Sequence, residues 1–294
     1  MRFVPRVAFA LLVSAALGVV LGSCTHRGTP APLPSMTTQP TERTVYVNAR
    51  TGSDSANGSQ ATPYKTITKA LKAVASPGPI PVLDIELANG DYNTANGEVF
   101  PLVLPSVTGL VINGSTYGHL AVRGAFIDGA GEDTAYEKAV SAPAGSYYTT
   151  IAIPPGVQVS MTSLYVGAKN PKLPGTATYD AIDLLGQLTG TTASFNAPPT
   201  LGAPRLNGVL VAGGTFSCAS CSVAGKNYAI AAFSIPGTQC GGSSSSGSGG
   251  GQCPTVTLTG GNTGPGSIGG PIGIRSDGTA AVTASNQTFS AELT

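Results

Sequence analysis

Carboxylates can perform acid–base chemistry, and the second half of this chain has few of them, among which Asp180 and Asp183 lie three positions apart. Beyond Val140 only Asp277 and Glu292 add further carboxylates. Hydrolysis of a glycosidic bond needs two carboxyl groups at a fixed separation, one as the acid and one as the base or nucleophile. On a regular strand an offset of three places the two side chains on opposite faces, whereas a turn between them would bring them together.

A polysaccharide lyase would instead need a basic side chain beside a carboxylate that a calcium ion neutralises. Histidine offers little for this role, because His119 is the only one that follows the first 30 residues. We interpret the scattered basic residues as solvated surface charges, since they share no acidic cluster: Arg123, Lys169, Lys172, Arg205, Lys226 and Arg275. We therefore assign no catalytic residue from the sequence.

The segment 128–133 has the oxygen-rich composition of a cation-binding loop. Asp128 and Asp133 are its candidate calcium ligands, although the complete ligand pattern of an EF-hand is missing. The alternative is a glycine turn after a strand that ends at Ile127. We favour the turn and expect no other metal and no cofactor.

The elements that must position these side chains are mostly β-strands, and 83–87 shows the clearest alternation of apolar and polar residues. Segments 114–119 and 128–146 are predicted to be loops that project from the strands, and no fixed repeat period is visible. Further strand candidates, separated by turn residues, lie at 102–104, 110–112, 121–127, 157–166, 181–188, 206–211, 228–233, 255–258, 272–274 and 280–289.

Composition supports a packed β domain. Charged residues make up 10% of the 294 residues, hydrophobic residues 41%, and there are 40 glycines and 23 prolines, which is typical of many turns around an apolar core. The net charge of +1 shows no basic excess, so we expect no nucleic-acid partner. The absence of tryptophan and the 6% aromatic content argue against a dedicated carbohydrate-binding module.

One amphipathic helix is predicted near the front of the domain, after a short strand at 45–47 and a polar loop. Thr66 is its expected N-cap, and the Pro-Gly-Pro run at 77–79 should end it. Lysines keep to the wet side of this helix, while its apolar face is formed by Ile67, Ala70, Leu71 and Val74. A helix of this kind can cover the open end of a stack of strands and block pairing at exposed edges.

The stretch from 44 to 131 resembles the family called domain of unknown function 1565, with Tyr64 where members commonly have Phe. The family's first motif is matched by Gly52, Asp54, Asn57, Gly58, Pro63, Lys65, Thr66 and Ile67, and a later one, N-G-E-x-F-P-L, by the segment with Glu98, Phe100 and Pro101. The resemblance implies an all-β, right-handed parallel β-helix over 44–294, pectate-lyase-like and with one short N-terminal capping helix. It implies no established activity.

Two of these family-like positions carry carboxylates whose role is open. Glu98 is expected either to cap backbone N–H groups of the next rung or to bind a ligand, and we favour capping. Asp54 and Asn57 are interpreted as turn-forming residues rather than ligands.

Residues 1–24 resemble a bacterial lipoprotein signal. Positive charge precedes an uncharged apolar stretch at 7–20, which is short for a transmembrane helix. The following Leu-Gly-Ser-Cys resembles a lipobox, so Cys24 is the expected site of lipidation, with an ordinary secretory signal as the alternative. Thr25 rather than Asp follows, so in a bacterium with two membranes we expect the outer membrane, with 25–43 as a Pro/Thr-rich linker.

Of the five cysteines, Cys24 would carry lipid, which leaves Cys218, Cys221, Cys240 and Cys253. An even number in an exported protein suggests two disulfides, and three pairings are possible. We favour Cys240 with Cys253, because they bracket a Gly/Ser run that cannot pack, and a local bridge for the other two. A zinc site built on the Cys-x-x-Cys pair is the rival.

Three functional hypotheses follow. The first is a lipid-anchored cell-surface β-helix that serves adhesion, envelope structure or partner binding without catalysis. The second is a polysaccharide lyase or hydrolase with an atypical site. The third is a glycan-binding module that uses Tyr117, Tyr147 and Tyr148, which are expected on loops. Envelope components and glycans are therefore the expected partners beside the membrane.

Overall fold

The computed structural model describes residues 42–76, 78, 80–117, 124–169, 173–197, 205–236, 253–260, 267–269, 272–277, 280–285 and 288–290. The expected signal at 1–24, its Cys24, and the linker up to residue 41 lie outside these residues. Among the described segments, no helix combines the length and the apolar character needed to cross a membrane.

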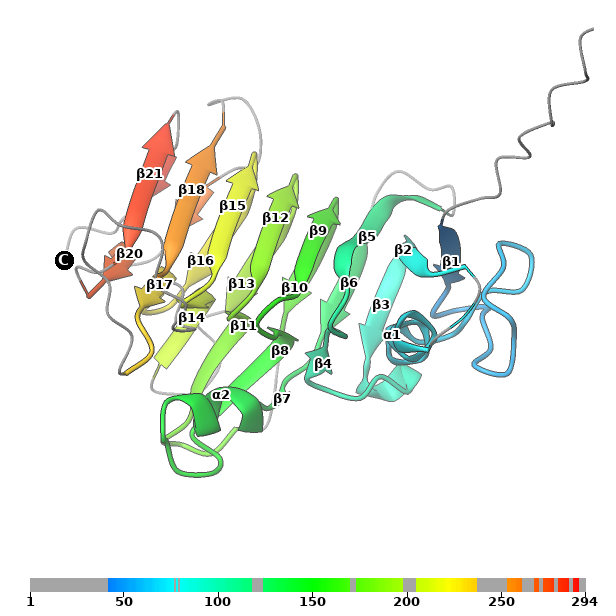
Figure 1. The fold of residues 1–294 in the computed structure, drawn as a ribbon, viewed down its shortest axis with the longest axis horizontal. Coiled ribbons are helices and arrows are strands. Elements are labelled where there is room, and N and C mark those ends of the chain that lie inside the picture. The colour runs from blue at the N-terminus through cyan, green and yellow to red at the C-terminus, as the bar shows by residue number, and fades with distance from the viewer. Residues whose placement is uncertain are drawn as a thin grey trace, which may run out of the picture. The chain divides into compact units, whose positions relative to one another are not determined.

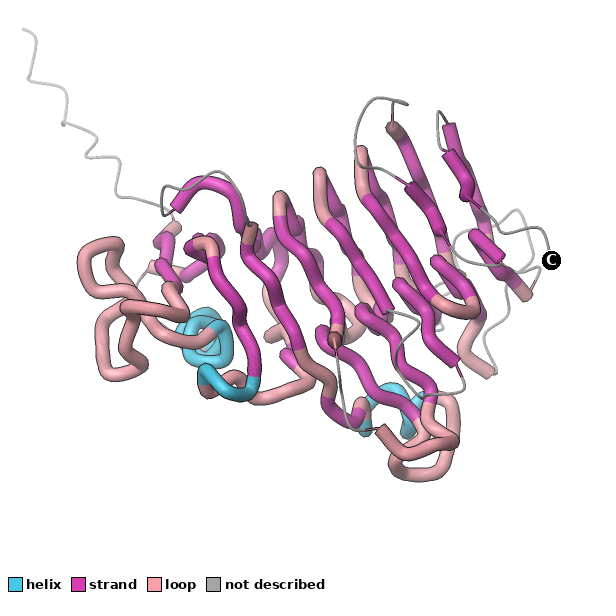
Figure 2. Tube along the Cα trace, turned by 180° about the vertical axis from the view of Figure 1, so that it is seen from behind, coloured by secondary structure: helices cyan, strands magenta, loops and turns pink. Residues whose placement is uncertain are grey.

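The strands form three sheets whose neighbours pair in parallel, and the chain visits the sheets in turn (Figures 1 and 2). One sheet contains, in order, β1 (Arg43–Val47), β2 (Val82–Ala88), β5 (Thr108–Tyr117), β9 (Gln158–Thr162), β12 (Gln187–Thr191), β15 (Thr215–Ala219), β18 (Thr255–Thr259) and β21 (Ala281–Ser285). Each passage through the three sheets is one rung of a parallel β-helix, which confirms the expected fold class.

The second sheet contains β3 (Gly90–Asn93), β6 (Ala125–Asp128), β10 (Leu164–Gly167), β13 (Ser194–Ala197), β16 (Ser222–Gly225), β19 (Ser267–Gly269) and β22 (Thr288–Ser290). The third contains β4 (Leu102–Val103), β8 (Tyr147–Ile153), β11 (Thr178–Leu184), β14 (Arg205–Ala212), β17 (Tyr228–Phe233) and β20 (Ile272–Ser276). A short strand, β7 (Gly131–Glu132), pairs antiparallel with β8.

Apolar residues of successive rungs lie in register and form the core between the sheets. In the first sheet Val159 pairs with Leu188 and Leu188 with Phe216, and all three side chains are buried. In the third sheet Ile151, Ile182 and Val209 are aligned in the same way. Inward-facing positions therefore repeat by rung, and each rung buries its apolar face only against its neighbours.

The rungs differ in length, which explains why the sequence shows no fixed period. Loops of different size follow equivalent strands, so the sequence distance between aligned residues changes from rung to rung. In the third sheet, for example, Ile151 aligns with Ile182, and Val209 with Ile230.

The N-terminal end is covered by α1 (Ile67–Ala75), as the sequence predicts (Figure 1). The buried face of α1 consists of Ile67, Ala70, Leu71 and Val74, which belong to the main core. The Thr66 hydroxyl accepts a hydrogen bond from the Lys69 N–H at 3.0 Å, so Thr66 is the N-cap. The helix ends at Ala75, just before the expected Pro-Gly-Pro stop.

Thr66→Ala should lower the free energy of unfolding by about 1–2 kcal/mol, because it removes the N-cap acceptor. It also removes the hydroxyl that donates to Asp54 Oδ2 at 2.8 Å. Urea unfolding checks the value. Thr51→Ala, in the exposed part of the same loop, is the matched control and should change stability by less than about 0.5 kcal/mol. Equal effects for the two variants would contradict the capping role.

The strand at 83–87 is present, but the alternation is wrong at its start. Leu83 is only partly buried, and Val82 is buried in its place. The pairing of β1 with β2 shifts after Arg43, which lies opposite Val82, while Thr44 lies opposite Asp84. This bulge adds one residue and reverses the face of the residues before it.

The expectation of a loop across 128–146 is wrong, because this segment contains β7 and a second helix, α2 (Thr134–Ala139). Asp133 is the N-cap of α2, and Tyr136 and Glu137 are buried. A helix of six residues is too short to show a 3.6-residue periodicity, so sequence patterning misses it. One turn of 3-10 helix, η1 (Thr94–Asn96), is also present.

Cys218 and Cys221 form a disulfide bond with a Cα–Cα distance of 5.9 Å, which is the local bridge favoured from the sequence. Cys253 is also disulfide-bonded. Cys240, its expected partner, lies outside the described residues, so that pairing stays a prediction.

Candidate functional site

The polar residues of the first family-like motif hold the cap loop together. Asp54 Oδ1 accepts the N–H groups of Lys65 and Thr66, each at 2.9 Å. Asn57 Oδ1 accepts the Ser59 N–H at 2.9 Å. Asn57 therefore makes the local contact of a turn-forming residue, whereas Asp54 instead joins the loop to Lys65 and Thr66, 11 and 12 positions further along the chain.

The glycines and the proline of this motif allow the loop to pack closely against Tyr64. A Cβ at Gly52 would lie 2.1 Å from the Tyr64 carbonyl oxygen, and a Cβ at Gly58, whose φ is +76°, would meet the Tyr64 ring. Pro63 is buried beside them, and its carbonyl oxygen accepts the Ser53 N–H at 3.0 Å. The motif therefore encodes the backbone conformation of this loop.

Glu98 caps α1 from a distance in sequence. One carboxylate oxygen accepts the Ile67 N–H at 2.6 Å, and the other accepts the Thr68 N–H at 2.9 Å and the Thr68 hydroxyl at 2.7 Å. Burial raises the pKa of Glu98 above its usual value, the hydrogen bonds oppose this rise, and the nearby Asp54 charge adds to it. The expected capping role is correct, but the capped groups belong to the helix and not to the next rung.

The Phe100-Pro101 pair packs against the turn at 129–131. A Cβ at Gly129 would lie 2.1 Å from the Phe100 ring, and one at Gly131 would lie 2.1 Å from the Phe100 carbonyl oxygen. The glycines are thus required for close packing with the later family-like motif, and the turn interpretation of this segment is supported.

The two calcium candidates have separate structural roles. Asp128 accepts the Lys169 N–H at 2.7 Å and lies 3.6 Å from Lys169 Nζ. Asp133 accepts the Tyr136 N–H at 2.9 Å as the cap of α2. In the part of the chain that the structure describes, no group of three His, Cys, Asp or Glu side chains could hold a metal ion.

The structure brings Asp180 and Asp183 together, and Asp133 joins them. The pairing of β11 with β14 aligns Asp180 with Asn207 and Asp183 with Leu210 but skips the residue after Asp180, and the same step is skipped between β8 and β11. This kink places both aspartates on the side of the sheet that α2 covers. The opposite faces expected for a regular strand are therefore wrong here, and the two carboxyl groups meet without the turn given as the alternative, since β11 continues as a strand from Thr178 to Leu184.

We call Asp133, Asp180, Asp183 and Asn207 the acid cluster. Its members are 0–5% exposed. Asn207 Nδ2 donates to Asp180 Oδ1 at 2.6 Å, but no donor reaches the other oxygen of Asp180 or either oxygen of Asp183. One oxygen of Asp133 and the Asn207 carbonyl oxygen also lack a donor. The cluster therefore contains more acceptors than donors, which added protons would correct.

Burial is the main cause of the raised pKa values in the acid cluster. The pKa of Asp180 rises to about 7, with the Asn207 hydrogen bond opposing the rise. The pKa of Asp183 rises well above its usual value, first through burial and then through the neighbouring Asp180 and Asp133 charges. Near neutral pH Asp180 and Asp183 thus hold protons that exposed carboxyl groups would have released.

Two tyrosines separate the acid cluster from solvent. Tyr136 of α2 packs edge-on against Tyr147 of β8, with ring centroids 4.8 Å apart, and burial raises the pKa of both. Tyr147 also borders a surface cavity of about 490 Å³ whose wall includes Arg205. The covering segment is fixed by Glu137, which accepts the Ser146 N–H at 2.7 Å and the Tyr147 N–H at 2.9 Å.

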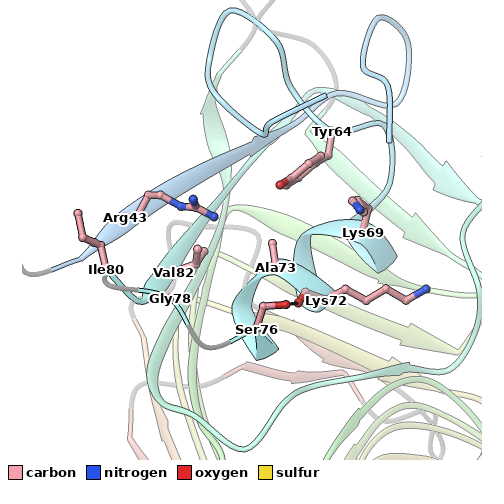
Figure 3. Close-up of a pocket in the computed structure, with 9 residues that line it drawn as sticks. All are labelled: Arg43, Tyr64, Lys69, Lys72, Ala73, Ser76, Gly78, Ile80 and Val82. Atoms are coloured by element: carbon pink, nitrogen blue, oxygen red, sulfur yellow. Dashed lines mark hydrogen bonds between the residues drawn. The ribbon is translucent and has the colours of Figure 1, made fainter. Parts of the chain in front are cut away.

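A second cavity, of about 420 Å³, lies between β1 and α1, and we call it the cap pocket (Figure 3). Arg43, Lys69 and Lys72 contribute its charges, and its lining contains no carboxylate. Figure 3 shows the Arg43 guanidinium and the Tyr64 hydroxyl turned toward the space above Ala73. Its remaining lining consists of Ser76, Gly78, Ile80 and Val82.

The comparisons with known proteins identify part of the chain. Residues 50–172 match the family described as "Protein of unknown function (DUF1565)". This segment is a DUF1565 domain. It contains α1, the Glu98 motif and α2, and it extends beyond the 44–131 stretch recognised from motifs. Asp180 and Asp183 lie outside the matched residues.

No curated protein matches the sequence. Among solved structures, the lacto-N-biosidase of glycoside hydrolase family GH136 from Eubacterium ramulus is similar, with 10% identity and a TM-score of 0.37. The match covers 74% of this chain and 36% of that enzyme, so the chain spans about a third of its length. We take from it no residue role and no activity.

Sequence reasoning missed the acid cluster and the cap pocket for the same reason. The cluster depends on a kink in β11 and on α2, and the pocket depends on how β1 sits beside α1. The one local signal was the pair Asp180 and Asp183 itself.

Proposed function

We propose that this protein is an exported, lipid-anchored β-helix of the bacterial envelope that binds or supports partners without catalysis. Acylation at Cys24 and the linker that follows would tether the DUF1565 domain, with the outer membrane as its location in a bacterium with two membranes. Envelope components and glycans are the expected partners, and a nucleic acid is not.

The main support for a role without catalysis is that the described carboxylates have structural partners or are buried. Every Asp and Glu in the described part of the chain except the exposed Glu42 accepts a structural hydrogen bond, pairs with Lys169 or belongs to the acid cluster. Glycosidases keep their two carboxyl groups about 5–9.5 Å apart around the substrate. Here Asp180 and Asp183 lie against each other beneath a helix, with no room for a sugar between them.

Metabolic labelling with a palmitate analogue tests the anchor. The wild-type chain should incorporate label and fractionate with membranes, and Cys24→Ser should do neither. Cys218→Ser is the control, because that thiol is in a disulfide within the domain, and it should still be labelled. Label on Cys24→Ser, or none on the wild type, would contradict the anchor.

The second candidate is a polysaccharide hydrolase or lyase in which α2 moves to open the acid cluster. The raised pKa of Asp180 favours it, since a group that is protonated near pH 7 can act as a general acid. Screening the purified full chain on acidic and neutral glycans, with and without calcium, tests it. Product formation that Asp180→Asn abolishes, and that Glu42→Gln leaves intact, would replace the first proposal with this one.

The glycan-binding alternative is weaker, because Tyr147 and Tyr148 lie in β8 and are half-buried rather than on loops. Tyr147 packs on Tyr136 and Tyr148 packs against a minor core cluster. The side chain of Tyr117 lies outside the described residues.

A further inference from the structure

The cap pocket brings together cations that the fold itself does not neutralise. The structure pairs none of Arg43, Lys69 and Lys72 with a carboxylate in the described part of the chain, where Lys169 is the residue that forms ion pairs. Asp84 of β2 and Glu98, which contacts α1, bond to other groups. Asp84 accepts the Thr44 hydroxyl at 3.1 Å, and Glu98 caps α1. The pocket thus presents positive charge that is free for an external anion.

The arrangement of the lining is suited to an anionic group with an apolar neighbour. Arg43 offers a planar fork of donors, Tyr64 offers a hydroxyl, and Lys69 lies 5.9 Å from the Tyr64 ring centroid. In Figure 3 the Lys72 side chain extends away from Arg43, so it adds charge at the rim. Ala73, Ile80 and Val82 provide an apolar wall. The volume of about 420 Å³ falls within the range of small-molecule sites.

The cap pocket lies near the point where the linker joins the domain, and this position indicates the membrane as the source of an anionic ligand. Arg43 is the first residue of β1, so the pocket lies at the end of the β-helix where the expected linker enters. A linker of about 18 residues keeps this end within reach of the anchoring membrane. Phosphate groups are the anions that such a membrane surface presents in greatest number, and near it each Lys or Arg contributes about 1 kcal/mol of attraction.

We propose that the cap pocket binds the phosphate of an anionic phospholipid headgroup, one whose charge no choline or ethanolamine cation balances, and so docks the N-terminal end of the β-helix onto the membrane. The proposal rests on the lipid anchor proposed above, which supplies the proximity. Arg43 and the Tyr64 hydroxyl hold the phosphate, Lys69 adds charge, and the apolar wall receives the glycerol portion.

Vesicle co-sedimentation of the full chain carrying Cys24→Ser tests the proposal without any contribution from acylation. The probes are vesicles containing phosphatidylglycerol and vesicles of phosphatidylcholine alone. Arg2, Arg6 and the apolar segment 7–20 are present in every variant, so the pocket is measured by how much its own substitutions change the preference for anionic vesicles. The Cys24→Ser chain with an unchanged pocket should bind the anionic vesicles clearly more tightly than the phosphatidylcholine vesicles. Free sn-glycerol 1-phosphate should compete with the anionic vesicles for the pocket.

The double variant Arg43→Gln, Lys69→Gln should lower this preference about 10- to 30-fold, since two cations near the surface are lost. The double variant Lys138→Gln, Lys226→Gln removes the same charge from exposed positions far from the pocket and should lower it less than about 3-fold. Circular dichroism confirms that both variants are folded.

Equal losses in the two double variants, or no preference for anionic vesicles, would overturn the proposal. Binding of glycerol phosphate without binding of anionic vesicles would overturn it as well, because the membrane would then not be the source. The palmitate experiment is independent of these results. Failure of the anchor and failure of the pocket can therefore be distinguished.

Discussion

Asp183→Asn should make the protein more stable at pH 8, by on the order of 3 kcal/mol. The substitution removes a carboxyl group whose ionisation is opposed by burial beneath α2 and by the neighbouring Asp180 and Asp133 charges. The new amide can donate to the oxygens of Asp180 and Asp133 that have no donor. Thermal unfolding followed by circular dichroism at pH 5 and pH 8 measures the change.

The pH dependence of this effect follows from the raised pKa values. Between about pH 4 and pH 7 the folded chain keeps protons on the acid cluster that the unfolded chain has released, because the pKa of Asp180 is about 7 instead of 3.8. The contribution of these extra protons to the free energy of unfolding is therefore fully present below about pH 4. It is lost as the pH rises toward the folded pKa, by up to about 1.4 kcal/mol per pH unit for each proton. Asp183→Asn should flatten this fall.

Glu42→Gln is the control, since it removes the same charge from an exposed position and should leave the pH profile unchanged. An unaltered profile for Asp183→Asn, or a lower melting temperature at pH 8, would show that the cluster does not hold extra protons.

Glu98→Ala should open the N-terminal cap. It leaves the Ile67 and Thr68 N–H groups without acceptors at a buried site, which costs about 3 kcal/mol. Because α1 lies at the end of the stack, this cost should appear first as local opening. Amide hydrogen exchange within α1 should accelerate about 100-fold, while exchange in β11 changes little.

Glu98→Gln is the graded control, because its side-chain oxygen can still accept one of the two N–H groups. Its exchange rates should fall between those of the wild type and Glu98→Ala. Similar acceleration in α1 and β11 would mean that the cap does not open separately from the rest of the β-helix.

The fold could be predicted largely because the cap is encoded locally. The apolar residues of α1 follow helical spacing, Thr66 precedes them, and the loop glycines are needed wherever this loop packs on Tyr64. The sequence could also show that strands were many and turns frequent. The bulge that exchanges Val82 for Leu83 could not be anticipated, because it depends on how β1 pairs with β2.

The acid cluster could not be predicted because its members meet through tertiary structure. Asp133 and Asp183 lie 50 positions apart, and only the superposition of one rung on the next brings their carboxyl groups into contact. The kink beside Asp180 then reverses the orientation that a straight strand would give. Sequence spacing predicts which side chains share a face within one helix or strand. The residues of the acid cluster come from different rungs, so sequence spacing does not predict that they meet.

The bond from Glu98 to α1 has a consequence for biosynthesis. Synthesis proceeds from the N-terminus, so the first turn of α1 is made about 30 residues before Glu98, the side chain that caps it. The sequence separation of their hydrogen bonds gives this interval. During that interval the N-terminal rung of the growing β-helix has α1 but not the Glu98 side chain that caps it. The cap of α1 is therefore completed only after the segment up to Glu98 has been synthesised.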